Sequence, residues 1–151
     1  MIRPTKITKG KPKRKGGSVL EAALIVPILV SLGFGMAEFS YFFFVKHTLE
    51  GSAREAARNA IVPNATYTGA VTAANNSTTA AGISTALTSV AFKDLTTGAT
   101  LTSANFGTAT SPGDAIQVTV TGTWSSIGVH PMNIIPGTKQ VQGTCVMRKE
   151  G

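Results

Sequence analysis

Apolar residues are concentrated in one long stretch near the start of the chain. Residues 19–45 contain only two charged side chains, Glu21 and Glu38. A hydrocarbon core about 30 Å thick needs roughly 20 helical residues, and this stretch is longer than that. Pro27 is compatible with a helix in lipid, because no solvent competes there for the backbone amides. The pattern predicts a transmembrane helix with a kink at Pro27.

A secretory signal is the competing interpretation of this stretch. Gly35-Met36-Ala37 is a small-x-small triplet that follows an apolar run, as at a signal-peptidase site. Cleavage there would make Glu38 the first residue of the mature chain. The apolar run is long for a secretory signal, which favours the membrane span.

The helical pattern continues beyond the apolar stretch. In residues 46–61, acidic and basic side chains stand three and four positions apart, a spacing that places them on one helical face (Glu50 with Arg54, Glu55 with Arg58). We expect one continuous helix from about residue 18 to residue 61, ended by Pro63. Its other face suits close packing, because it carries mainly small residues: Leu49, Ala53, Ala56, Ala57 and Ala60.

Composition changes after the predicted helix. Residues 64–113 consist mostly of Thr, Ala, Ser, Gly and Asn, and only Lys93 and Asp94 among them are charged. Apolar side chains at roughly helical intervals favour a second helix near residues 68–89. Disorder is the alternative, although disordered tracts usually combine low hydrophobicity with a high net charge.

Strand patterns follow in the last forty residues. Residues 115–124 alternate apolar and polar side chains, which is the period of a half-buried strand, and a turn at residues 111–114 precedes them. A second strand is predicted at residues 139–148. Two strands alone are marginally stable, so we expect a third within residues 90–105 or a covering helix. The predicted fold class is α+β: a long transmembrane helix that continues into a small extracytoplasmic domain with an antiparallel sheet.

Charge is just as unevenly distributed. The formal charge of +7 lies entirely in a basic arm at the N-terminus, which holds seven of the fourteen Lys and Arg residues and no acid. Nucleic-acid binding requires basic residues spread over a folded face, so a terminal run argues against it. Positive residues beside a span tend to stay on the cytoplasmic side. We therefore expect a single-pass protein of the inner membrane, with its C-terminal domain in the periplasm or outside the cell.

The sequence contains no pattern typical of catalysis. His47 lies at the predicted membrane boundary and His130 in a Pro-flanked loop, and neither has a partner acid or Cys at ligand spacing. Asp94 and Asp114 stand beside turn residues, where Asp commonly stabilises the backbone. We predict neither enzymatic activity nor a metal, a cofactor or a small-molecule substrate.

Ionisable residues within a span are candidate functional sites. If the chain is cut after Gly16, Gly17 becomes the first residue, and its new α-ammonium lies four residues from the Glu21 carboxylate. That pair can form within one helix or register one subunit against the next; alternatively, Glu21 is an interfacial residue favoured by the helix dipole. Glu38 falls near the outer boundary, where we expect it to reach the headgroups or, alternatively, to contact a partner.

Four segments of the N-terminal half carry motifs in register: Gly16 to Glu21, Leu20 to Pro27, Gly35 to Phe39 and Ala53 to Arg58. In the first, the basic arm runs into a Gly, four residues and a Glu, which is similar to the prepilin peptidase pattern. The other three are similar to the motifs VEFALVLP, G-x-x-E-F and AAREGAR. Together the four segments resemble the TadE-like minor pseudopilins of tight-adherence (Flp-type) pilus systems, which implies a pilin-like fold. One position departs from the pattern, since Ala22 stands where the family usually has an aromatic residue.

The resemblance implies a non-enzymatic component of a pilus or of a type II/IV-related secretion system. It further implies cleavage by an aspartyl prepilin peptidase between Gly16 and Gly17, with other pilins and pseudopilins as partners. Residues 1–16 would form the leader, 17–62 the helix and 63–151 the domain. The alternative function is a membrane-anchored or secreted surface module for adhesion or ligand binding.

Overall fold

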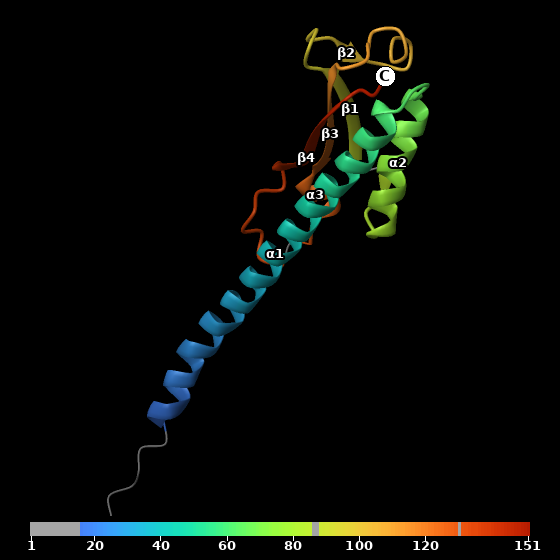
Figure 1. Ribbon diagram of the computed structural model, residues 1–151. Helices are drawn as coiled ribbons and strands as arrows, with labels where there is room; N and C mark the ends of the chain where they lie inside the picture. The colour runs from blue at the N-terminus through green and yellow to red at the C-terminus, as the bar shows by residue number, and fades with distance from the viewer. Residues whose placement is uncertain (1–15, 86–87, 130) are drawn as a thin grey trace, which may run out of the picture. The chain divides into compact units, whose positions relative to one another are not determined.

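The computed structural model describes residues 16–85, 88–129 and 131–151, and its fold class is α+β, as predicted. A long apolar helix precedes a small domain with a four-stranded antiparallel sheet (Figure 1). Contacts divide the chain into two units, with the boundary inside the first helix between Gly33 and Phe34. The elements are α1 (Gly16–Ile61), α2 (Tyr67–Ala80), β1 (Thr88–Asp94), β2 (Thr100–Leu101), β3 (Ala115–Thr123), α3 (Trp124–Ile127) and β4 (Gln140–Arg148).

Helix α1 runs without a break through Pro27, so the prediction of one continuous helix is confirmed. It ends at Ile61, two residues before Pro63, and the backbone then takes a left-handed conformation at Asn64 (φ 61°). The terminal carbonyl of Ile61 accepts a hydrogen bond of 2.9 Å from the backbone N–H of Glu150. The last residues of the chain therefore satisfy one of the carbonyls that a helix end leaves open.

The sheet has the order β2-β1-β3-β4, and every neighbouring pair is antiparallel. In β3 the side chains alternate strictly between buried and partly exposed, which confirms the strand predicted from the period-two pattern. Val118, next to the centre of the strand, pairs with Phe92 of β1 and with Cys145 of β4. The predicted third strand is present as β1, and the predicted turn at residues 111–114 closes through a hydrogen bond of 3.1 Å from Asp114 N to Ser111 O.

The second half of α1 packs on the apolar face of the sheet (Figure 1). Gly143 of β4 meets the helix so closely that a Cβ there would fall on the backbone of Leu49 and Glu50. Such an approach is possible only because the helix face is built from small side chains and the strand has none at this position. The predicted close-packing face of α1 is confirmed, since Ala53, Ala56, Ala57 and Ala60 are all buried.

Helix α2 confirms the predicted second helix, but its predicted end was wrong. The helix stops at Ala80 instead of residue 89, because Gly82 takes a left-handed conformation (φ 79°) and the N–H of Ile83 turns back to the carbonyl of Thr78 (3.0 Å). A glycine just past the last turn is a common helix terminator. The chain then enters the sheet as β1 (Thr88–Asp94), the start of which overlaps the predicted helix.

Aromatic side chains hold the domain together in two clusters. Tyr67, Phe92 and Phe106 contact one another edge to face, with ring centroids 5.2 to 5.8 Å apart. Trp124, which is fully buried, packs against Tyr41 and Phe42 of α1 at 6.0 and 5.2 Å. Aromatic pairs at these distances add about 1 kcal/mol each beyond their buried area. The second cluster ties α1 to the end of β3.

Candidate functional site on the N-terminal helix

The predicted cleavage junction lies at the very start of α1. The helix begins at Gly16, so Gly16 and Gly17 both belong to its first turn. Gly17 is exposed, and a Cβ added to it would meet nothing within 4 Å. The predicted basic leader lies outside the described residues. Within the described part of the chain, no protein group covers Gly17.

Glu21 lies one helical turn after Gly17 and is exposed to the surroundings. Its neighbours Leu20 and Leu24 are also exposed, and between residues 17 and 33 only Ser31 is partly covered. The Ser31 hydroxyl bonds to its own helix, at 3.0 Å from the carbonyl of Ile28. In residues 16–85, 88–129 and 131–151, Glu21 has no hydrogen-bond or ion-pair partner.

Pro27 is exposed within this bare half of the helix. Its ring provides no N–H, so the carbonyl of Ala23 cannot receive the usual bond from the residue four positions on. The helix nevertheless continues on both sides of Pro27, which agrees with the expectation for a helix in lipid.

Glu38 is buried, and the expectation that it reaches the lipid headgroups was wrong. Its side chain is 1 % exposed. Its two carboxylate oxygens accept backbone N–H groups from the loop between α3 and β4: Oε1 from Ile135 at 2.9 Å and Oε2 from Met132 at 3.3 Å. Hydrogen bonds to a charged acceptor contribute about 1.5 to 3 kcal/mol each. The carboxylate therefore holds this loop against α1.

The local backbone explains why the loop can reach Glu38. Between the two donors, Asn133 adopts a left-handed conformation (φ 53°), which aims both N–H groups at the helix. Gly35 precedes Glu38 by three residues and is buried, and a Cβ there would lie 3.1 Å from the terminal methyl of Ile134. The absence of a side chain at Gly35 therefore leaves room for the loop to approach the helix one turn before Glu38.

The span available to lipid on all sides is shorter than predicted. The sequence pattern extended it to Val45, but Val45 is completely buried in the domain core. Helix α1 remains the one element of the described chain that is long and apolar enough to cross a membrane. Its fully bare part, residues 17–34, measures about 27 Å at 1.5 Å per residue.

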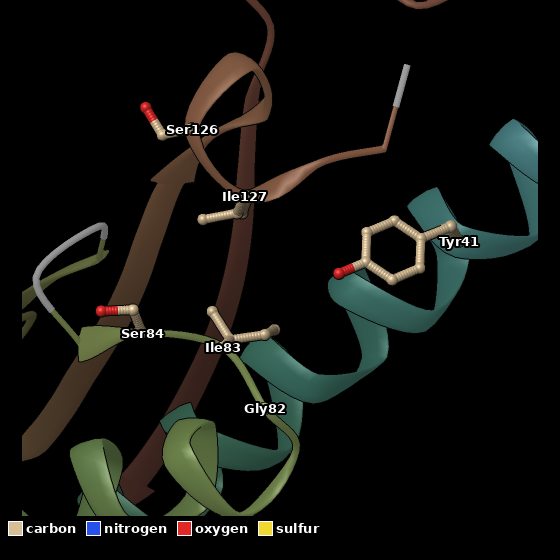
Figure 2. Close-up of a pocket in the computed structure, with 6 residues that line it drawn as sticks. All are labelled: Tyr41, Gly82, Ile83, Ser84, Ser126 and Ile127. Atoms are coloured by element: carbon tan, nitrogen blue, oxygen red, sulfur yellow. The ribbon is translucent and has the colours of Figure 1, made fainter. Parts of the chain in front are cut away.

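A small pocket lies beside the helix within the domain (Figure 2). It has a volume of about 180 Å³ and is lined by Tyr41, Gly82, Ile83, Ser84, Ser126 and Ile127. The Tyr41 ring extends from α1 toward the two isoleucines, whereas the Ser126 hydroxyl points away from them (Figure 2). The polar side chains of the lining are the hydroxyl groups of Tyr41, Ser84 and Ser126, and no His, Cys or charged residue is among the lining residues.

Potential metal ligands do not form a cluster in the described chain. In residues 16–85, 88–129 and 131–151, no three His, Cys, Asp or Glu side chains come together as a metal site would require. His130 lies outside the described residues. His47 instead stands 3.4 Å from Glu50, which is also 3.9 Å from Lys46. Asp94 and Asp114 both accept hydrogen bonds within their own turns, as predicted.

Comparison with known proteins connects this helix with a family. The model of the family described as TadE-like protein matches residues 16–58, which is less than a third of the chain. The match begins where α1 begins and ends within its last turn, so it covers the helix and not the sheet. No curated protein and no solved structure matches significantly. The resemblance seen in the sequence is thereby confirmed over the helix, and this family implies involvement in the Tad (tight-adherence) pilus.

Proposed function

We propose that this chain is a non-enzymatic minor pseudopilin that acts in the assembly of a tight-adherence (Flp-type) pilus or of a related type II/IV secretion system. Residues 1–16 form a leader, residues 17–62 the transmembrane and extended helix, and residues 63–151 an extracytoplasmic domain. The protein resides in the inner membrane with its N-terminus in the cytoplasm. Its partners are the membrane, a prepilin peptidase and other pilins and pseudopilins.

One observation carries this proposal: the family match starts at Gly16, and the helix that follows it is bare around Glu21. A helix without protein cover on any side needs lipid or neighbouring helices, because exposed apolar surface of this extent is unfavourable in water. The helix of a pilin-type subunit meets both environments in turn: it is surrounded by lipid in the membrane and by neighbouring helices in the assembly.

The basic arm then acts as a topology signal. It keeps the N-terminus in the cytoplasm until the peptidase cuts between Gly16 and Gly17. The cut removes the whole excess of positive side chains, since the remaining chain has seven basic and seven acidic residues. It also creates an α-ammonium one turn from Glu21. At a separation of about 4 Å and an effective dielectric of 20, the pair attracts by on the order of 4 kcal/mol.

The position of Glu38 supports a junction at Gly16 over a secretory cut after Ala37. A cut after Ala37 would open α1 directly beside the carboxylate that holds residues Met132 and Ile135. It would also remove Gly35, against which Ile134 packs. A cut after Gly16 leaves all of these contacts in place.

The mass of the mature chain tests the proposal. We expect that co-expression with a prepilin peptidase yields a chain that starts at Gly17, and that a Gly16→Val variant stays at full length. A Gly51→Ala variant is the control, because Gly51 lies in the same helix with nothing within 4 Å of an added Cβ. A chain that starts at Glu38 would indicate secretion, and an intact Met1 would indicate a plain anchor; either result contradicts the proposed processing.

A further inference from the structure

The loop between α3 and β4 presents apolar side chains outward. Val129, Met132 and Ile134 are 56 %, 43 % and 45 % exposed, although Ile135 beside them is buried. The sequence from Gly128 to Thr138 contains no Lys, Arg, Asp or Glu. An exposed apolar loop without charge is unfavourable in water, so the question is what covers it.

The loop's height along α1 is fixed by its contacts. Glu38 accepts hydrogen bonds from Met132 and Ile135, and Ile134 packs over Gly35. The exposed side chains of the loop therefore lie at the level of residues 35–38 of the helix. This level comes directly after the part of α1 that is bare on all sides.

Helix α1 adds exposed apolar side chains from this level onward. Met36, Phe39 and Phe43 are three and four residues apart, so they share one helical face, and all three are exposed. The same face becomes polar at His47, which is largely exposed and paired with Glu50. Between Phe43 and His47 this helix face changes from apolar to polar. Beyond Phe43 it is therefore better suited to contact with water than with lipid.

We propose that these six side chains, Val129, Met132 and Ile134 of the loop and Met36, Phe39 and Phe43 of α1, form an apolar collar that inserts into the outer leaflet of the bilayer spanned by α1. The occupant is lipid at the boundary between headgroups and acyl chains, where apolar side chains of interfacial segments are buried. The bare part of α1 is slightly shorter than a hydrocarbon core of about 30 Å, and the collar supplies the missing apolar height.

In this arrangement Glu38 is a positioning residue. Its carboxylate faces backbone N–H groups and not lipid, so the collar exposes no charge at the described positions. The loop acts as a second membrane contact that limits how far the domain can tilt or rise above the surface. This inference requires that α1 spans a bilayer, and it depends neither on cleavage nor on pilus assembly.

The test measures the depth of spin labels in the full chain, reconstituted at one chain per lipid nanodisc. Labels are attached to Met132→Cys and Ile134→Cys in a Cys145→Ala background, because Cys145 is the only native cysteine. Leu29→Cys serves as the lipid control, since this side chain is exposed in the bare part of α1. Gln142→Cys serves as the water control, because it is exposed on the polar face of β4.

We expect the two loop labels to collide with oxygen several-fold more often than with a water-soluble nickel chelate, as the Leu29 label does. The Gln142 label should show the reverse preference. Water-like collisions at both loop positions, with a lipid-like Leu29 label, would overturn the inference. Water-like collisions at Leu29 as well would overturn the span together with it. Protection from nickel that arises only at several chains per disc would assign the collar to a protein partner and contradict lipid insertion.

Discussion

The side chains of residues 17–33 of α1 are exposed, apart from the partly covered Ser31. From Gly35 onward, in contrast, the helix contributes a buried face to the domain core. Both halves belong to one helix, and one family model matches both. They differ in side-chain size and charge: the first half is mainly apolar, with Glu21 as its one charged residue, whereas the end of the second half has buried alanines on one face and exposed charged residues on the other. The difference teaches that one continuous helix can leave its side chains exposed in one half and use them for internal packing in the other.

The two carboxylates repeat this contrast. Glu21 is exposed and without a partner in the described chain, and Glu38 is buried and accepts two backbone hydrogen bonds. In the sequence both are acids in an apolar stretch, and Glu38 was expected to reach the headgroups. Glu38 therefore contributes to the packing of its own chain, whereas a contact of Glu21 with other molecules is part of the proposed function.

The largest effect is expected at Gly143. A Gly143→Ala substitution places a methyl group on the backbone of Leu49 and Glu50, which cannot move without separating α1 from the sheet. We expect a loss of about 5 kcal/mol or more, comparable to the whole stability of a small domain. Fluorescence of Trp124, the only tryptophan and fully buried, reports unfolding. Gly51→Ala is the matched control and should be neutral or slightly stabilising, since Ala favours helix by about 1 kcal/mol.

Paired leucine truncations compare the two halves directly. Leu49 is 0 % exposed and Leu29 is 59 % exposed, on the same helix. Leu49→Ala should lower the free energy of unfolding of the domain by about 3 kcal/mol, because it leaves a cavity in the core. Leu29→Ala should leave the unfolding transition in place. Equal effects of the two variants on thermal unfolding in detergent would remove the distinction between the halves.

A smaller effect is expected from acid. The Thr97 hydroxyl donates to the Asp94 carboxylate and holds its pKa below the usual value, with a further contribution from the backbone N–H of Thr96. A group with a lowered folded-state pKa stabilises the protein above its unfolded pKa, and this contribution is lost as the pH falls through the folded pKa. We therefore expect the unfolding midpoints of wild type and Asp94→Asn to differ above about pH 4 and to converge below it. A gap that stays constant from pH 6 to pH 2 would contradict this assignment.

Sequence patterns predicted much of the fold because most of it depends on local periodicity. The 3.6-residue pattern and Pro63 predicted the end of α1, and the period-two alternation predicted β3. The end of α2 was missed because Gly82 was not recognised as its terminator. The inward orientation of Glu38 could not be predicted, because its hydrogen-bond donors lie 94 and 97 residues further along the chain.

The division of roles between the two carboxylates is tested most directly by comparing Glu21→Ala and Glu38→Ala in cells that assemble the pilus. Both variants are scored for their unfolding midpoint and for co-purification with pilus components. Glu21→Ala should unfold like wild type, remain cleaved and yet co-purify poorly. Glu38→Ala should unfold more easily, by on the order of 2 kcal/mol, because two N–H groups lose their acceptor. Unchanged co-purification of Glu21→Ala, or an unchanged unfolding midpoint of Glu38→Ala, would contradict this account.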